Sequence, residues 1–249
     1  MHIDLFYYAC AIVAVVLSGL AKGGFSGIGA LSTPILALAI DPVRAAAILL
    51  PILIVQDAVS VWAFRASWDR TVLAIMVPGM TIGVALGYLF AAQVSESAVL
   101  GVLGGISVLF GLHRLWVERH GQIALPSNSP AWIGVLFGVG SGFTSQIAHA
   151  GSPPFQMWVL PRRLPRDVLI GTTAIAFAVM NWIKVPAYAA LGQFTPANLV
   201  ATALLVPVAL LSTVAGVHLA RKVDPARFYV LIYLLMVLLG LKLIADAIL

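Results

Sequence analysis

The stretch Gly19-Leu-Ala-Lys-Gly-Gly-Phe-Ser-Gly-Ile-Gly29 ends the first long apolar segment of the chain, which covers about residues 5–21. A second stretch, Gly140-Ser-Gly-Phe-Thr-Ser-Gln-Ile-Ala-His-Ala-Gly-Ser-Pro-Pro154, ends the fifth such segment in the same way. Glycine and proline are unfavourable inside helices, so each stretch predicts a helix break. A short apolar arm follows each break, at about 26–40 and 152–160. The chain therefore contains two broken helices at matching places.

The composition defines the class of protein. Of the 249 residues, 61% are hydrophobic and only 9% are charged. Soluble domains contain about 45–50% apolar and about 25% charged residues, so a water-soluble globular domain and a disordered chain are both excluded. A membrane barrel would need short strands with alternating polar positions, whereas this chain has long unbroken apolar runs. An all-α membrane protein is predicted.

Apolar stretches of spanning length define the expected helices, since about 20 residues are needed to cross a bilayer. They cover about 5–21, 45–64, 72–92, 98–117, 131–147, 168–190, 197–220 and 228–248. The arm at 152–160 is too short to cross at about 1.5 Å per residue. We expect about eight transmembrane helices plus two short re-entrant or broken arms.

Charge and cysteine content narrow the possible functions. The formal net charge of +5 would suggest nucleic acid as a partner of a soluble protein, but here the basic residues stand singly or in pairs at segment ends. Orientation in the membrane explains them better. The single Cys10 excludes an intramolecular disulfide and a paired-thiol centre. The first residues lack a basic region, so no cleavable signal peptide is expected.

The two halves of the chain are similar to each other. Gly24-Phe25-Ser26 matches Gly142-Phe143-Thr144 at an offset of 118 residues. Three further matches share an offset of 129, namely Pro78 with Pro207, Gly87 with Gly216, and Gly111 with Gly240. Chance pairing of glycines and prolines is the alternative. We predict a first transmembrane repeat at 1–118, a connecting loop at 119–130 and a second repeat at 131–249.

The basic residues distinguish two ways of threading the chain. If each break turns its arm back, ten basic residues fall on one side and only Arg44 and Lys242 on the other. If each broken segment is one continuous span, the split is five against seven. Basic residues concentrate on the cytoplasmic side, so the hairpin arrangement is predicted, with inverted halves and both termini in the periplasm. The ten residues are Arg65, Arg70, Arg114, Arg119, Arg162, Arg163, Arg166, Arg221, Lys222 and Arg227.

The two breaks are the predicted binding site. Irregular backbone at membrane depth is tolerated where it is buried in protein or lines a wet cavity. A half-helix that starts there presents N–H groups and a positive dipole end, which favour an anion. We expect backbone N–H groups at 24–29 and 144–152 to hold it. The candidate substrate-binding residues are Lys22, Gly24, Ser26, Gly27, Thr144, Ser145, Gln146, His149, Ser152, Asn181 and Lys184.

Close helix packing through small residues is the alternative explanation for glycine-rich segments. We assign to packing two series at four-residue spacing, Gly79/Gly83/Gly87 and Gly134/Gly138/Gly142.

Four ionisable residues are expected in or near the membrane, where charge is costly. Lys184 and Lys22 are candidates for neutralising an anion, and the alternative for both is snorkelling to an interface. His149 is a candidate for binding the anion or carrying a coupling proton, and a packing histidine is its alternative. Asp57 is expected to pair with a lysine or to protonate during transport, in a structural or coupling role.

No motif of an enzyme competes with this interpretation. The sequence holds no HExxH, GxSxG or P-loop pattern, and its histidines lack metal-ligand spacing. No enzyme activity, cofactor or metal is expected.

At Gly19–Gly29, with Pro34 after it, and again at 140–145, the sequence resembles the sulfite exporter TauE/SafE family, also called the toluene sulfonate uptake permease family. The resemblance covers nearly the whole chain. It implies a bacterial inner-membrane secondary transporter for sulfur-containing anions such as sulfite, sulfoacetate or isethionate. The resemblance implies site positions only at the two breaks, which correspond to residues 22–29 and 142–153 of this chain. A related branch that handles thiosulfate uses several cysteines, so the single Cys10 argues against that substrate.

We therefore expect an inverted-repeat carrier that exports a small sulfur-containing anion by alternating access between the two broken helices. An inside-negative potential favours anion exit by about 2.3 kcal/mol per charge per 100 mV. The expected partners are the anion, the lipid bilayer and a coupling proton or other ion, without nucleic acid. An anion channel and a membrane scaffold or assembly factor without cargo are the alternatives.

Overall fold

The computed structural model describes residues 5–25, 28–91, 93, 95–120, 129–220 and 226–248. The described part is all-helical and contains no strand, as predicted. The long helices are α1 (Leu5–Lys22), α3 (Pro42–Phe64), α4 (Arg70–Ala91), α5 (Glu96–His120), α6 (Ala131–Ala148), α8 (Arg166–Ala190), α9 (Pro196–Ala220) and α10 (Ala226–Ile248). Their bounds lie within three residues of the eight predicted stretches. The short elements are η1 (Ile28–Leu31), α2 (Ser32–Leu36), α7 (Ser152–Val159) and η2 (Leu160–Arg162).

The long helices form a bundle with an apolar outer surface. Among the described residues, α1, α3, α4, α6, α8 and α9 are long and apolar enough to cross a membrane, and α5 carries a shorter apolar stretch at Gly101–Val117. Large apolar side chains point outward, such as Trp62, Leu109 and Leu211, which are 70%, 71% and 72% exposed. Such a surface is compatible with lipid and not with water. The protein is a multi-pass membrane protein, and the number of crossings stays a prediction.

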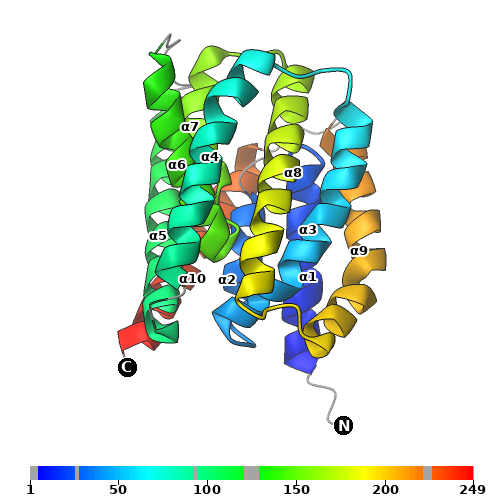
Figure 1. The fold of residues 1–249 in the computed structure, drawn as a ribbon, viewed down its shortest axis with the longest axis vertical. Coiled ribbons are helices and arrows are strands. Elements are labelled where there is room, and N and C mark those ends of the chain that lie inside the picture. The colour runs from blue at the N-terminus through cyan, green and yellow to red at the C-terminus, as the bar shows by residue number, and fades with distance from the viewer. Residues whose placement is uncertain are drawn as a thin grey trace.

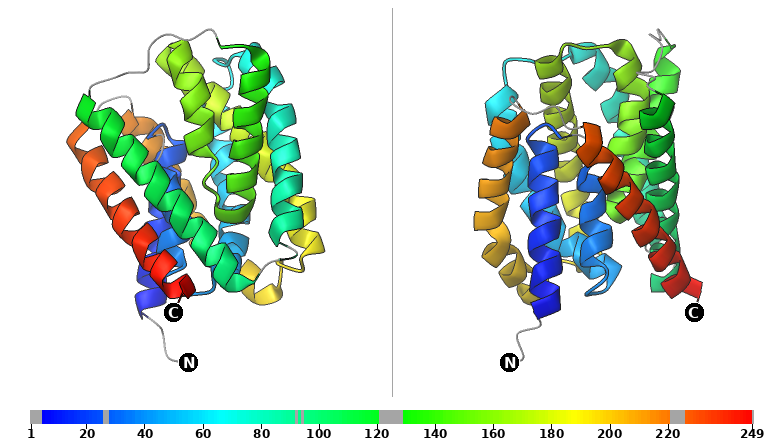
Figure 2. Two further views of the ribbon diagram at one scale, coloured as in Figure 1. Left: turned by 90° about the vertical axis from the view of Figure 1, so that its left-hand side faces the viewer. Right: turned by 180° about the vertical axis from the view of Figure 1, so that it is seen from behind.

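The threading places the basic residues at one end of the bundle. In Figures 1 and 2, α1 begins and α10 ends at the same end, and α1 and α6 run in opposite directions. The α3–α4 connection, the end of α5 and η2 lie at the opposite end, which we call the basic end. Eight of the ten basic residues predicted to be cytoplasmic belong to these segments or to the first turns of α4, α8 and α10, whereas Arg221 and Lys222 lie outside the described residues.

Both short arms turn the chain back. The five residues of α2 and the eight of α7 are far too few to cross, since eight residues of helix rise only about 12 Å. The segment after α1 returns to the end where α3 begins, and α7 returns to the basic end (Figure 2). This is the hairpin arrangement that the charge distribution favoured.

Glycine contacts bring the helices of the main pairs close together. A Cβ built on Gly138 of α6 would lie 2.6 Å from the Met76 carbonyl oxygen and 3.2 Å from the Gly79 Cα in α4. In the other half, a Cβ on Gly216 of α9 would lie 3.1 Å from the Gly23 Cα, directly after α1. The glycine series in α4 and α6 therefore serve packing, as predicted.

When each helix is replaced by its equivalent in the other half, one packed helix pair turns into another packed pair. Helix α1 packs on α9 while α6 packs on α4, and α3 packs on α9 while α8 packs on α4. The central pairs α3–α8 and α5–α10 join equivalent helices of the two halves. Proline interrupts both α4 and α9, at Pro78 and Pro207. The inverted repeat stays a prediction, and these pairings are the ones it requires.

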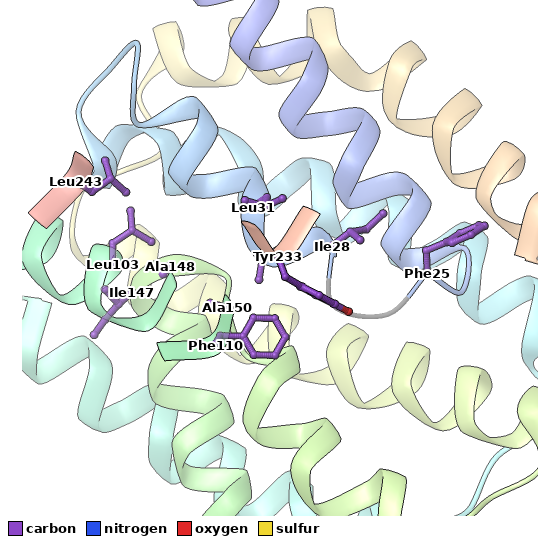
Figure 3. Packing of buried hydrophobic residues seen from close by; sticks show 11 residues of the cluster. Phe25, Ile28, Leu31, Leu103, Phe110, Ile147, Ala148, Ala150, Tyr233 and Leu243 are labelled. Atoms are coloured by element: carbon purple, nitrogen blue, oxygen red, sulfur yellow. The ribbon is translucent and has the colours of Figure 1, made fainter. Parts of the chain in front are cut away.

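The two breaks meet in one buried cluster (Figure 3). Phe25 and Ile28 from the first break pack with Ile147 and Ala150 from the second, against Tyr233 of α10. The helices α1 and α6 each contact α3, and residues from the ends of both line one cavity. The functional side chains of the breaks are thereby brought together.

Candidate anion-binding site

A cavity lies where the ends of α1 and α6 meet α3 and α8. Its lining includes six of the predicted binding residues, which come from both breaks and from α8. The complete lining is Ser18, Ala21, Lys22, Gly24, Gly29, Ala30, Leu53, Ser145, His149, Ser152, Ile170, Thr173, Ala174, Phe177 and Asn181. The sequence-predicted site is therefore gathered around one space, except for the residues described below.

Lys22 and Asp57 form an ion pair at the wall of the cavity. The Lys22 Nζ lies 2.5 Å from Asp57 Oδ1, and the Asn181 amide donates to Asp57 Oδ2 at 2.6 Å. The Asp57 side chain is only 2% exposed, whereas the Lys22 side chain is 13% exposed and reaches the cavity. Its ammonium also lies 5.2 Å from the centre of the Phe177 ring. The expected pairing of Asp57 with a lysine is present, so its charge is balanced.

Lys184 is fully buried directly behind the cavity. Its Nζ lies 2.7 Å from His149 Nδ1, 3.1 Å from Ser145 Oγ and 3.3 Å from the Ser145 carbonyl oxygen. These three acceptors are electrically neutral, and no ion pair to Lys184 is present in the described part of the chain. Lys184 thus caps the carboxyl end of α6, where the helix dipole favours a cation.

The hydrogen bonds of His149 define its tautomer. His149 is the C-cap of α6 with φ of 52°, and its Nε2 lies 2.8 Å from the Ala46 carbonyl oxygen. A carbonyl can only accept, so Nε2 carries a hydrogen and donates it. In the neutral ring, Nδ1 is then the acceptor that faces Lys184. His149 therefore links the second break to α3 and to α8.

With Lys184 protonated, the charges around the cavity do not sum to zero. Lys22 and Asp57 cancel, and the pair of Lys184 with His149 retains one positive charge when Lys184 is protonated. A buried charge without a counter-ion is strongly unfavourable. An anion in the cavity would balance it.

The second break supplies few but well-placed backbone donors. The N–H groups of His149 and Ala150 donate to the Ser145 and Thr144 carbonyls at 3.0 and 3.3 Å, so they are not available to a ligand. The N–H groups of Gly151 and Ser152 have no acceptor among the described residues. Since Pro153 and Pro154 lack an N–H, these two are the donors that the first turn of α7 offers.

The first break has a different backbone. The N–H groups of Gly24 and Phe25 donate to the Ala21 and Leu20 carbonyls at 3.2 Å each and so close the end of α1. Gly24 has φ of 129°, which favours glycine, and it lines the cavity. Two predicted binding residues, Ser26 and Gly27, lie outside the described residues.

Besides Lys184, two described residues of the predicted binding set do not line the cavity. The Thr144 hydroxyl lies 2.8 Å from the Gly140 carbonyl oxygen and 2.9 Å from that of Ala150, so it holds the turn between α6 and α7. The buried Gln146 side chain packs against α4, where a Cβ on Gly87 would lie 2.7 Å from the Gln146 Cβ. Both residues therefore stabilise the second break without contacting the cavity.

Several lining residues were not singled out from the sequence. Thr173 and Phe177 of α8 lie two turns and one turn before Asn181, respectively, on the same helix face as Lys184. Counting back from Lys184 and Asn181 in steps of three and four residues would have found this face. Ser18, one turn before Lys22 in α1, could have been found by the same rule.

A layer of packed side chains around Tyr188 closes the cavity on the side away from the basic end. The α8 residues of the cavity extend from Ile170, one turn after the start of α8 at the basic end, to Asn181. Further along α8, away from the basic end, Tyr188 packs with Ala46 and Leu50. The Tyr188 hydroxyl donates to the Gln146 carbonyl at 2.9 Å. The cavity therefore extends from mid-bundle toward the basic end.

A cavity with several polar residues in its wall, between two broken helices of a multi-pass membrane protein, is typical of membrane transporters. Comparison with known families matches residues 11–243 to the sulfite exporter TauE/SafE family. The chain belongs to the TauE/SafE family of sulfite exporters, as the resemblance of the two glycine-rich motifs predicted, and it is a membrane transporter. Comparisons with curated proteins and with solved structures gave no match.

Proposed function

We propose that the protein is a secondary transporter that exports small sulfur-containing anions, such as sulfite or organosulfonates, across the bacterial inner membrane. The single observation that carries this proposal is the fully buried Lys184, which has no ion-pair partner among the described residues and lies behind a cavity at both helix breaks. The family points to the same class of cargo. The sequence holds no P-loop, so ion or substrate gradients are the proposed driving force.

The donors around the cavity match a sulfonate or sulfite group. Lys22 offers its ammonium, and Ser152 at the start of α7 offers its backbone N–H. The Ser152 hydroxyl oxygen accepts from Gln156 at 2.8 Å and the Ser145 hydroxyl oxygen accepts from Lys184, so both hydroxyl hydrogens can be donated to an anion. Several charge-assisted and neutral hydrogen bonds would then replace the water around the anion.

The rest of the wall suits an organic substituent. Leu53, Ile170 and Phe177 line the cavity beside the polar groups. The Asn181 Oδ1 is buried and has no hydrogen-bond partner among the described residues. A hydroxyl or ammonium group on the cargo would supply the missing donor. An organosulfonate with a short polar tail therefore fits better than a bare inorganic dianion.

The closed layer at Tyr188 supports a carrier rather than an open channel. In alternating access, the site opens to one side at a time. The cavity extends toward the basic end, which the charge rule assigns to the cytoplasm, so this conformation is the inward-facing one in our proposal. Export then requires closure at the basic end and separation of Tyr188 from Gln146.

Efflux from proteoliposomes tests the proposal. Vesicles that contain the purified protein are loaded with radiolabelled isethionate, sulfite, sulfate or acetate, and release is followed with and without unlabelled anion outside. A carrier gives saturable release of isethionate or sulfite that is accelerated by external substrate. Fast release without saturation would establish a channel, and no release of any sulfur anion would refute the proposed cargo.

A further inference from the structure

A carrier with a charged site needs a way to return without its cargo. With Lys184 protonated, the described groups at the cavity carry one net positive charge, and a monovalent anion brings that sum to zero. Moving the unloaded, charged site through the protein interior would be strongly unfavourable. The unloaded carrier therefore needs either a second anion or the loss of one proton.

The hydrogen bonds around Lys184 show where that proton resides. The Ala46 carbonyl fixes a hydrogen on His149 Nε2, so the variable proton lies between Lys184 Nζ and His149 Nδ1, which are 2.7 Å apart. If the Lys184–His149 pair loses this proton, the neutral amine still has two hydrogens to donate, to His149 Nδ1 and to Ser145. The same contacts therefore accommodate the charged and the neutral pair.

The other titratable groups near Lys184 are occupied or distant. Asp57 of α3 already binds Lys22 of α1 and Asn181 through its two oxygens. Tyr188, one turn further along α8, donates to a backbone carbonyl. Helix α4, which also packs on α8, carries Arg70 in its first turn and Tyr88 in its last. No carboxylate in the described part therefore holds the charge on Lys184 permanently.

We infer that the transporter moves one proton together with each monovalent anion, and that the Lys184–His149 pair carries this proton. The inference rests on the proposed function. On the side where the anion enters, Lys184 Nζ takes a proton from water, and the anion then neutralises the pair. On the opposite side the anion leaves, and the proton returns from the pair to water. In both the loaded and the unloaded carrier, the cavity groups and any bound anion together have zero net charge during the change between the two access states.

Two properties follow from this stoichiometry. A monovalent anion, such as a sulfonate with a neutral tail or hydrogen sulfite, is the preferred cargo, because a divalent anion leaves one negative charge uncompensated. The membrane potential does not act on the loaded carrier, so the gradients of the anion and the proton set the direction of net transport. Export then requires an outward anion gradient that exceeds any inward proton gradient.

Gradient-driven accumulation of radiolabelled isethionate in proteoliposomes tests the inference. Isethionate stays a monoanion over the useful pH range. A carrier that moves one proton per anion accumulates isethionate about tenfold for one pH unit, acid outside, with the potential clamped at zero. An inside-positive potential of about 100 mV adds nothing to this accumulation of isethionate. The same potential would accumulate a freely moving monoanion about 50-fold.

The outcomes separate the two proposals. Accumulation driven by the pH gradient and indifferent to the potential supports proton cotransport. Accumulation driven by an inside-positive potential without a pH effect overturns it and leaves the anion transporter intact. No uptake under either gradient overturns proton cotransport, and if labelled isethionate also fails to exchange for unlabelled isethionate, the transporter itself is refuted.

Lys184→Arg provides a second test, because a guanidinium does not release its proton. Net uptake needs the unloaded carrier to return, whereas exchange of labelled for unlabelled isethionate does not. We expect the ratio of net uptake to exchange to fall about tenfold or more, which is a barrier change of about 1.4 kcal/mol. The matched control is Lys242→Arg, at an exposed pair with Asp246, which should keep the wild-type ratio. An unchanged ratio in Lys184→Arg would overturn the role of Lys184.

Discussion

Removal of Lys22 alone should destabilise the protein more than removal of Lys22 together with Asp57. In Lys22→Met, the Asp57 carboxylate loses an ammonium at 2.5 Å and keeps only the Asn181 amide. The side chain of Asp57 is 2% exposed, so water cannot replace the lost partner. The double variant Lys22→Met/Asp57→Asn has no buried charge left at this position, and its new amide can still bond with Asn181.

The magnitude follows from the burial. Breaking a buried ion pair by removing one partner costs about 3–5 kcal/mol, and the partial exposure of Lys22 favours the lower end, about 3 kcal/mol. For a chain of this size, 1 kcal/mol corresponds to about 2–4 °C, so thermal unfolding in detergent should occur about 10 °C lower in Lys22→Met. The double variant should recover most of this loss, because no unpaired charge remains.

A matched control uses the exposed pair of Lys242 with Asp246, whose side chains are 55% and 43% exposed. Lys242→Met should change stability by about 0.3–0.5 kcal/mol, as is usual for exposed helix pairs. If Lys22→Met and the double variant unfolded at the same lowered temperature, the loss would come from packing and the charge argument would be refuted.

The remaining predictions concern binding and packing. Lys184→Met should abolish stabilisation by isethionate in thermal unfolding, because the uncompensated positive charge is gone. Asn181→Leu should weaken the binding of isethionate more than that of methanesulfonate, measured by calorimetry, since the unpaired Oδ1 would accept from the isethionate hydroxyl. Gly24→Ala should lower stability by about 1–3 kcal/mol, because alanine is strained at a φ of 129°. Gly138→Ala should destabilise by about 1–3 kcal/mol through its contact with α4, whereas Gly105→Ala, with open space around it, should be neutral or up to about 1 kcal/mol stabilising in the same assay.

The helices could be predicted from the sequence because each membrane-spanning helix needs a long apolar stretch, which is visible in the sequence. Apolar runs and their polar ends predicted the bounds of the eight long helices within three residues, and the basic residues selected the hairpin threading of both breaks. The four-residue glycine spacing in α4 and α6 correctly indicated close packing. These features depend on short stretches of chain and on the membrane as solvent.

The detailed wall of the cavity could not be predicted in the same way. Thr144 and Gln146 stand in the second break beside Ser145, yet only Ser145 lines the cavity, because successive residues of helix α6 point about 100° apart around its axis. Phe177 contributes to the wall without any motif of its own. The assignment of Lys22, rather than Lys184, to Asp57 depends on how α1, α3 and α8 pack together, which sequence spacing does not contain.

Thermal unfolding of the purified protein with and without isethionate is the most direct test of a buried cationic site for small sulfur-containing anions. A ligand present at 100 times its Kd stabilises by about 2.7 kcal/mol, which is a readable shift. The account predicts a concentration-dependent shift with isethionate or hydrogen sulfite, a smaller one with acetate, and none in Lys184→Met. Equal shifts in the wild type and in Lys184→Met, or no shift with any of these anions, would contradict it.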